Sequence, residues 1–355
     1  MRFILFLVIV FELSSCSSGK NDNTNSSISA NEVAAESELL TDSIPNIKNI
    51  VSDSFPLSSE LIIYPFHKIE MSNNSKTGFI PLGSGGFDPK DTSIIENKYL
   101  GMTEYEDYNY HILKHSYRSQ FLKKKNINES DIIYIYNTIL DSLEIYNVND
   151  ISIIAFITLY GGSYGGVRPG DYKIGFELKN NAIASNNFTN TLVYIGEYNP
   201  FMNGSLKPIK WKKIETKELP LLELNTQDSI HLFRYKNQKI ISTYSFKNES
   251  YEYFIQNIGE EGITYIRYLK IISLNDNNTL FSKVFFESEG TYLKPLNGLN
   301  KNNDEEEQVY QWTGKLFKNR APVIFGFLGW SFGCPKIQFI DNSERDIDIN
   351  CDNRH

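Results

Sequence analysis

The feature that most constrains the fold is a series of short apolar segments, separated by turn-forming residues, beyond Asp171. The segments are rich in β-branched and aromatic residues, which fit a pleated strand. Asn275–Asn278 and the pair Lys236 and Asn237 stand where hairpin turns belong. This spacing predicts antiparallel strands in a sandwich, a barrel or a curved sheet. The predicted strands are Tyr172–Leu178, Thr191–Tyr198, Ile230–Tyr235, Gln238–Phe246, Tyr251–Gln256, Gly262–Ser273, Thr279–Glu287 and Gln308–Phe317.

The composition agrees with a folded chain rich in strands. Hydrophobic residues make up 41% of the sequence, which is ordinary for a globular protein. Aromatic residues reach 14%, with 22 Tyr and 23 Phe. Packing within sheets accounts for so many tyrosines, and a surface that stacks on sugar rings is the sharper alternative.

One segment in the N-terminal half has a helical pattern instead. Across residues 100–125, Tyr110, Leu113, Tyr117 and Phe121 recur at steps of three and four, which makes one apolar stripe. Lysines follow at the end of this segment, where positive charge suits the helix dipole. The apolar positions between residues 140 and 146 fit either a short helix or a further strand.

The fold class that we predict is α+β and mainly β. It is an antiparallel β-sandwich or curved sheet, with one amphipathic helix in the N-terminal half. Residues 55–185 are expected to form a small α+β region, and residues 186–355 an antiparallel β region. Ile151–Tyr160 is apolar on both faces and is expected in the middle of a sheet. Ala321–Trp330 is nearly all apolar or Gly and is expected to be the most buried strand.

The first sixteen residues, MRFILFLVIVFELSSC, indicate where the protein is targeted in the cell rather than how it folds. Arg2 precedes the apolar run Phe3–Phe11. A helix that spans a membrane needs about 20 apolar residues, so this run is too short to cross. A short positively charged region, then an apolar region and then small residues before the cleavage site are typical of a secretory signal peptide.

The residues Leu13, Ser14, Ser15 and Cys16 add a more specific pattern. They resemble the lipobox of bacterial lipoproteins. The resemblance implies a signal peptide over residues 1–15, cleavage before Cys16, a diacylglycerol on the Cys16 thiol and acylation of the new amino terminus. Two or three acyl chains hold a protein durably on a membrane. Ser17 in place of Asp implies, by analogy with lipoprotein sorting, the outer membrane.

The segment after the lipobox predicts a tether. Residues 16–54 are rich in Ser, Asn, Asp and Glu, and such a composition buries too little apolar surface to offset its ordering entropy. We therefore expect a disordered tether ahead of the folded part. The formal net charge of −8 lacks the basic footprint of a nucleic-acid binding protein.

The cysteines divide according to the lipobox resemblance. If Cys16 carries lipid outside the cytoplasm, Cys334 and Cys351 remain in an oxidising compartment, and one pairing is possible. Ile347, Ile349 and Cys351 share one face by the period of two, as a buried half-cystine would require. We predict a structural disulfide between Cys334 and Cys351.

The strongest pattern of metal-binding residue types is a row of three. Asp107, His111 and His115 stand at i, i+4 and i+8 of the predicted helix, and this spacing can bind zinc. The zincin signature needs Glu after the first His, where this chain has Ile. A solvated helix face shared with Lys114 and Arg118 explains the same row, so we predict no metal and no cofactor.

Two other patterns have ordinary explanations. Asp346, Asp348, Asn350 and Asp352 alternate as in a calcium loop, but the outward face of an amphipathic strand explains them as well. The glycine-rich segments 81–86 and 161–166 read as loops, and the first lacks the ending of a P-loop.

These observations favour a lipid-anchored cell-envelope protein, most simply a non-enzymatic one that binds a glycan or a protein. The alternative is a hydrolase that acts on envelope or dietary polymers. An exposed row of Trp and Tyr on one sheet face would indicate glycan binding. Two facing carboxylates in a cleft would indicate the hydrolase.

Overall fold

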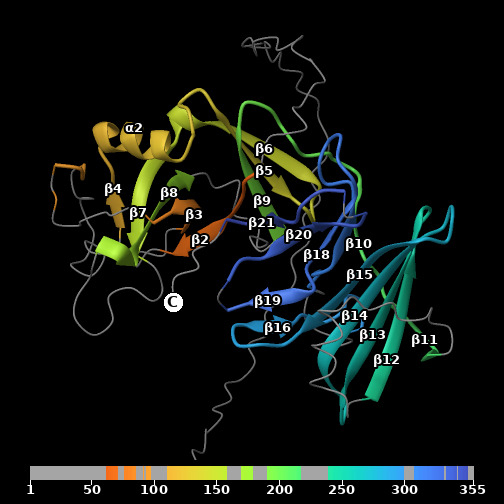
Figure 1. The fold of residues 1–355 in the computed structure, drawn as a ribbon. Helices are drawn as coiled ribbons and strands as arrows, with labels where there is room; N and C mark the ends of the chain where they lie inside the picture. The colour runs from red at the N-terminus through yellow and green to blue at the C-terminus, as the bar shows by residue number, and fades with distance from the viewer. Residues whose placement is uncertain are drawn as a thin grey trace, which may run out of the picture. The chain divides into compact units, whose positions relative to one another are not determined.

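Antiparallel strands make up most of the chain that the structure describes (Figure 1). The structure is a computed structural model. It describes residues 61–70, 76–84, 91, 93–96, 110–157, 169–178, 190–216, 239–299, 308–331, 333–341 and 343–350. Within these residues one α-helix occurs, so the predicted class, mainly β with one helix, is confirmed.

The strands form four larger sheets and one pair, and neighbouring strands in each sheet follow one another in this order. Sheet A is β1 (Ile63–Pro65), β9 (Thr191–Gly196), β5 (Ile132–Asn137) and β6 (Ser142–Asn147). Sheet B is β2 (His67–Glu70), β3 (Lys76–Gly83), β8 (Tyr172–Leu178), β7 (Ser152–Ile157) and β4 (Tyr110–Ile112). Sheet C is β10 (Leu206–Pro208), β17 (Trp312–Gly314), β18 (Val323–Phe325), β20 (Lys336–Phe339) and β21 (Ile347–Asp348). Sheet D is β11 (Lys212–Ile214), β12 (Lys239–Lys247), β13 (Tyr251–Glu260), β14 (Ile263–Ser273) and β15 (Thr279–Phe286). The pair is β16 (Thr291–Leu293) and β19 (Leu328–Trp330).

The central strands of sheet A, β5 and β9, are buried on both faces because their residues alternate between two hydrophobic cores. In β5, Ile133 and Ile135 contribute to core 1, which sheet A shares with sheet B and the helix. Tyr134 and Tyr136, the alternate residues, contribute to core 2, which sheet A shares with sheet C. Successive side chains of a strand point to opposite faces, so one apolar run serves both cores. This explains why several predicted strands lack a polar face.

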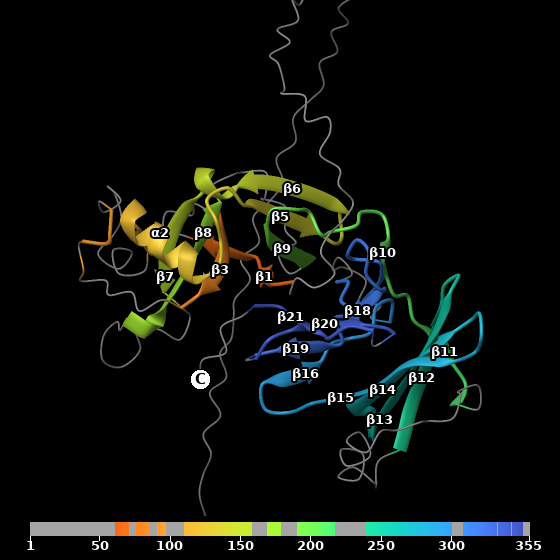
Figure 2. The same ribbon diagram turned by 45° about the horizontal axis from the view of Figure 1, so that its top comes forward.

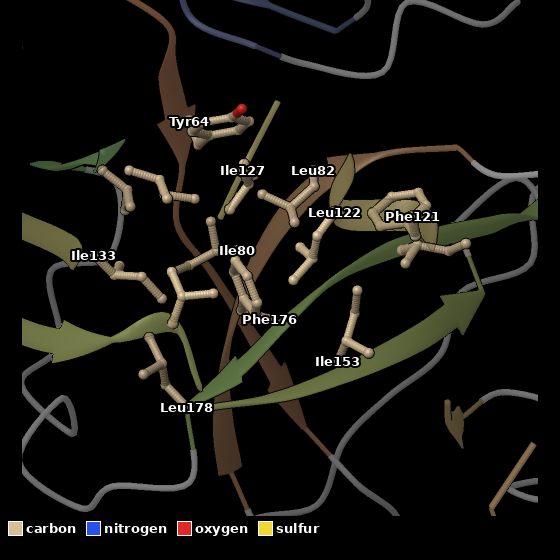
Figure 3. Packing of buried hydrophobic residues seen from close by; sticks show 14 of the residues in the cluster. Tyr64, Ile80, Leu82, Phe121, Leu122, Ile127, Ile133, Ile153, Phe176 and Leu178 are labelled. Carbon is tan, nitrogen blue, oxygen red and sulfur yellow. The ribbon is translucent and has the colours of Figure 1, made fainter. Parts of the chain in front are cut away.

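Core 1 shows how strands distant in sequence meet (Figure 3). Ile80 of β3, Ile153 of β7 and Phe176 of β8 come from sheet B, and Ile133 comes from sheet A. Phe121 of the helix closes the cluster. Each such side chain stabilises the fold by about 1.5–3 kcal/mol through the apolar surface it removes from water.

Sheets C and D share core 3. Ile324 of β18 faces this core while its neighbour Val323 faces core 2, so sheet C also serves two cores. Sheet D contributes Ile255 of β13 and Leu269 of β14. The predicted strand Ile151–Tyr160 behaves in the same way where it is described, because β7 alternates between core 1 and a small outer cluster.

A buried network of side-chain amides joins the segment after β16 to β17. The Asn297 amide donates to the carbonyl oxygens of Ile209 (2.9 Å) and Gln311 (2.8 Å). Its oxygen accepts from the backbone amides of Tyr310 (2.8 Å) and Gln311 (3.2 Å). The Gln311 side chain in turn donates to the carbonyl oxygens of Pro295 and Gly326. These side chains supply hydrogen bonds to backbone groups just ahead of β17, where the Gln311 carbonyl also accepts from the Ile209 amide at 3.0 Å.

The helix is shorter than the predicted one. Helix α2 covers His115–Lys124, whereas Tyr110–Ile112 forms strand β4 and Leu113 makes an isolated bridge to Ile95. Tyr110 and Leu113 are buried through sheet B and core 1 rather than as part of a helical stripe. The stripe prediction was therefore wrong at its N-terminal end, because apolar residues three apart also suit a strand and the bridge after it.

The predicted strand Ala321–Trp330 is two strands. β18 and β19 are separated at Gly326, which has a φ of +91°. A Cβ at this position would lie 1.8 Å from the carbonyl oxygen of Tyr310, so only Gly fits. The glycine-rich segment 81–86 also differs from a loop at its start, because Pro81–Gly83 belongs to β3.

Other strand predictions agree closely with the structure where it is described. β8 has the predicted bounds, β14 and β15 lie within a residue of theirs, and the turn between them contains Asn277 in the left-handed region. By contrast, the predicted Gln308–Phe317 is a strand only over Trp312–Gly314. Ile230–Tyr235 lies outside the described residues.

The chain from Ser54 to His355 forms one compact unit. The expected boundary between residues 185 and 186 falls within it, since β9 pairs with both β1 and β5. Residues 1–60, including the predicted signal peptide and tether, lie outside the described part of the chain. Across the ranges that are described, no helix has the length and hydropathy to cross a membrane.

Candidate binding surface

The hairpin of β5 and β6 exposes a set of large apolar side chains. Leu140 in the turn and Ile145 on β6 are each 58% exposed, and Ile139 in the turn is 37% exposed. In the described chain, eight large hydrophobic residues are exposed, so this one hairpin holds three of them. Figure 2 shows β6 beside β5, and β6 is the last strand of sheet A. We call Ile139–Asn147 the hairpin edge.

The turn of the hairpin is fixed by side-chain hydrogen bonds. The side-chain oxygen of Asn137 accepts from the backbone amides of Ile139 and Leu140, both at 3.0 Å. Asp141 adopts a φ of +49° and accepts from the Tyr136 hydroxyl (2.8 Å) and the Gly204 amide (2.9 Å). The exposed apolar side chains therefore project from an ordered turn, and Asn and Asp supply its turn chemistry.

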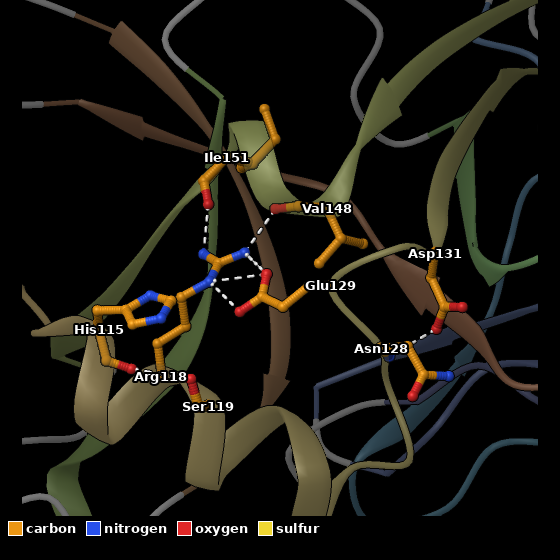
Figure 4. A network of polar contacts seen from close by, with 8 residues as sticks. All are labelled: His115, Arg118, Ser119, Asn128, Glu129, Asp131, Val148 and Ile151. Atoms are coloured by element: carbon orange, nitrogen blue, oxygen red, sulfur yellow. Dashed lines mark hydrogen bonds and ion pairs between the residues drawn. The ribbon is translucent and has the colours of Figure 1, made fainter.

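The open end of the hairpin is fixed by a buried arginine (Figure 4). Arg118 of α2 is 7% exposed, and its guanidinium pairs with Glu129 through contacts of 2.7 and 2.8 Å. It also donates to the carbonyl oxygens of Val148 and Ile151, directly after β6. Such bidentate, charge-assisted bonds are geometrically specific. They attach the end of β6 to the helix.

Burial and neighbouring charges shift the pKa values of two groups near the hairpin edge, Tyr136 and Glu129. Burial and the hydrogen bond to Asp141 raise the pKa of the Tyr136 hydroxyl well above its usual value. The Arg118 guanidinium beside Glu129 holds the pKa of that carboxyl below its usual value. Glu129 thus stays ionised near neutral pH, as the ion pair with Arg118 requires.

The acidic character of this region is visible in the sequence. From Asn126 to Val167 the chain has no Lys, Arg or His, while it has five carboxylates. On β6 itself Glu144 accepts from the Tyr146 hydroxyl at 2.7 Å. The hairpin edge therefore combines apolar side chains with negative charge.

The three candidate metal-binding residues do not form the helical row expected from the sequence. His111 lies on β4, where its ring packs 5.6 Å from that of Tyr172, and His115 begins α2. Asp107 lies outside the described residues. Across the described ranges, no group of three or more His, Cys, Asp or Glu side chains is arranged to hold a metal ion. Arg118, expected on a solvated face, is instead buried in the network described above.

The acidic residues near the C-terminus contact cations of this chain. Asp348 lies 2.9 Å from Lys336, and Asp346 lies 3.6 Å from Lys283 and accepts from Gln338. Ile347 between them is buried. This is the arrangement expected of the outward face of a strand.

The cysteine predictions fall largely outside the described residues. Cys16 and Cys351 are not described, and neither is the glycine-rich segment 161–166. Cys334 precedes β20, and the described chain reaches Asn350 after β21. The pairing of Cys334 with Cys351 stays a prediction.

Exposed aromatic side chains do not form a row where the chain is described. Tyr198 follows β9 and is 42% exposed, and Tyr292 on β16 is 50% exposed. Trp211 and Trp312 are buried. The stacked pair Tyr134 and Tyr194 (6.4 Å between ring centroids) packs on core 2, as expected of aromatic packing within sheets.

Comparison with known proteins identifies no relative, so the proposal for function is based on the geometry described above. No family model, no curated protein and no solved structure matches this chain. Sequence reasoning left residues 140–146 open between helix and strand, and so missed the hairpin edge. The signal that could have found it was the pair Asn137 and Asp141, which flank a turn between apolar runs.

Proposed function

We propose that this protein is a lipid-anchored protein of the bacterial cell envelope that acts by binding a protein partner. The anchor rests on the lipobox-like residues Leu13–Cys16 after a short apolar run. Two or three acyl chains on Cys16 would hold the folded part at the membrane surface. The partner would be another protein of the same compartment.

The observation that carries the binding role is the exposed hairpin edge. Soluble proteins expose single apolar residues commonly, but a group of them on one element marks an interaction site. Here the group stands on a hairpin whose turn and open end are both fixed by buried or specific hydrogen bonds. A surface that is ordered before it binds loses less entropy on binding.

Membrane fractionation tests the anchor. Expressed in a bacterial host that processes lipoproteins, the full chain should sediment with membranes and partition into detergent. The Cys16→Ala variant should move to the soluble fraction, because the acyl chains would be missing. Cys334→Ala serves as the matched control and should stay with membranes. Unchanged partitioning of Cys16→Ala would rule out the anchor.

Site-specific photo-crosslinking in cells tests the binding role. A photoreactive residue at position 145 should yield one protein adduct of discrete mass. The same residue at position 263 is the control, since Ile263 is 56% exposed and Ile145 is 58% exposed. Equal adducts at the two positions, or none at position 145, would contradict a binding role for the hairpin edge.

An oxidising compartment also supports the disulfide that we propose between Cys334 and Cys351. β20 and β21 are antiparallel, and the Ile349 amide donates to the Pro335 carbonyl at 2.8 Å. The pairing thus brings the start of β20 to the end of β21, so a bridge there would close a short loop and stabilise the fold by about 3 kcal/mol. Titration of the denatured, unreduced protein should find neither thiol reactive, and two reactive thiols would exclude the bridge.

A further inference from the structure

The hairpin edge differs from the other free edges of the described sheets. The outer strands β2, β4, β10, β11 and β21 have two to four residues. β1 is also short and makes a parallel bridge from Ile63 to Ile349. β15 has eight residues but exposes none of its large apolar side chains. β6 has six residues and pairs, among the described strands, with β5 alone.

Long apolar edges are normally avoided, because their free backbone groups pair with other chains. Natural proteins shorten such edges, cover them or place Lys on them. Most outer strands here follow the first rule, while β6 is longer, carries no Lys and is paired on one side only among the described strands. Its backbone is therefore available to an additional strand, as in complexes formed by strand addition.

The side chains of β6 define what such a strand would carry. Leu143 and Ile145 point to one face, and Glu144 points to the other. Ile145 lies opposite Tyr134 in the ladder, so its face continues the apolar surface of core 2. An added strand would place its alternate residues beside Ile145 and the others beside Glu144.

The negative charge of Glu144 indicates which residue types an added strand would place on the Glu144 face of β6. The segment from Asn126 to Val167 contains five carboxylates and no basic residue, and one of the five, Glu129, is paired with Arg118 of α2. Glu144 is the one charged side chain of β6, so a second copy of β6 would bring a second carboxylate to this edge. A strand with Lys or Arg at these positions would meet opposite charge instead, and opposite-charge pairs across strands are favourable.

We propose that β6 accepts an extended segment of a partner protein in which apolar residues alternate with Lys or Arg, and that this segment adds to sheet A as a fifth strand. The proposal rests on the binding role proposed above and names the chemistry of the partner at the hairpin edge.

Synthetic peptides test this with the purified full chain. The probe is a fluorescent eight-residue peptide of alternating Val and Lys, and binding is followed by fluorescence anisotropy at low salt. The Val–Lys peptide should bind at least ten-fold more tightly than a Val–Glu peptide. A Val–Lys peptide with alternate backbone amides N-methylated should also bind at least ten-fold more weakly, because strand addition needs those donors.

Matched variants place the binding on β6. Ile145→Lys should weaken binding of the Val–Lys peptide at least ten-fold, and Glu144→Gln should weaken it several-fold while leaving the fold intact. Ile263→Lys, equally exposed on sheet D, should change it less than two-fold. Equal losses for Ile145→Lys and Ile263→Lys would overturn the proposal.

Further outcomes separate this proposal from the binding role itself. Crosslinking at position 145 together with equal affinity for the methylated and unmodified peptides would keep the binding role and overturn strand addition. A wild-type dimer in light scattering that Ile145→Lys converts to monomer would assign the edge to a second copy and overturn the proposed partner.

Discussion

Two buried polar networks hold connecting segments in this protein, one through charged side chains and the other through neutral side-chain amides. At the open end of the hairpin, the charged Arg118 and Glu129 fix backbone carbonyls after β6. After β16, the neutral Asn297 and Gln311 fix backbone groups of β17 and its neighbours. The first network reaches the surface, because the Glu129 side chain is 38% exposed. The second is enclosed, with Gln311 fully buried.

The degree of burial accounts for the choice between charged and neutral side chains in the two networks. A charge taken fully out of water costs several kcal/mol, whereas an amide with all its hydrogen bonds made costs little. The enclosed network therefore uses amides, and the charged one keeps its carboxylate partly in solvent. The two should respond differently to substitution and to pH.

The largest effect is expected from Asn297→Ala. The substitution removes the partners of four hydrogen bonds, to Ile209, to Tyr310 and twice to Gln311. The Gln311 carbonyl would keep the Ile209 amide as a donor, whereas each buried backbone group left unpaired costs about 1–3 kcal/mol. Because water can enter and relieve part of this, we expect a loss of about 4 kcal/mol in the free energy of unfolding.

Urea denaturation measures this loss. The exposed Asn147, which donates to Asp150 at 2.7 Å, provides the matched control. Asn147→Ala should lower the free energy of unfolding by no more than about 0.5 kcal/mol. A loss below about 1 kcal/mol for Asn297→Ala would show that the amide network is not needed to hold the segment.

Glu129→Ala should have a smaller effect on the charged network. Removing one partner of a fully buried ion pair costs about 3–5 kcal/mol, because the remaining charge is left uncompensated. Here the partner is partly exposed and water can solvate the guanidinium, so we expect about 1–2 kcal/mol. Urea midpoints of wild type and variant measure it, and a loss as large as that of Asn297→Ala would contradict the comparison.

The charged network alone should respond to acid. The hydrogen bond from Arg118 lowers the pKa of Glu129 in the folded state. A carboxyl with a lowered folded pKa contributes stability above its unfolded pKa of about 4.3, and this is lost as the pH falls through the folded value. The urea midpoints of wild type and Glu129→Gln should therefore differ at pH 7 and converge as the pH falls below the lowered folded pKa of Glu129. A constant difference would exclude the linkage. The difference caused by Asn297→Ala should persist.

The sequence predicted local features better than distant ones. Strand β8 was predicted with its bounds because its apolar, β-branched run is bounded by turn residues. The helix was extended too far, because Tyr110 and Leu113 are buried by sheet B rather than by a helical stripe. The break at Gly326 depends on the distant Tyr310 carbonyl, which no local pattern reveals.

The candidate surface was harder to predict for the same reason. The burial of Arg118 depends on Val148 and Ile151, about 30 residues further along the chain. Whether Ile145 is exposed depends on β6 being the outer strand of sheet A, which local spacing does not determine. Residue type alone favoured burial for Ile145 and exposure for Arg118.

The smallest effect is expected from Ile145→Lys, and it separates binding from folding. Ile145 is 58% exposed, so Lys removes little buried surface, and β6 keeps its backbone pairing with β5. We expect a change within about 0.5 kcal/mol in the free energy of unfolding, the same as for Ile263→Lys. Urea denaturation at pH 7 measures both. A loss above about 2 kcal/mol for Ile145→Lys would mean that the side chain stabilises the hairpin itself. A negligible change combined with lost binding would place the role of Ile145 at the interface, where exposed apolar surface is useful only once a partner covers it.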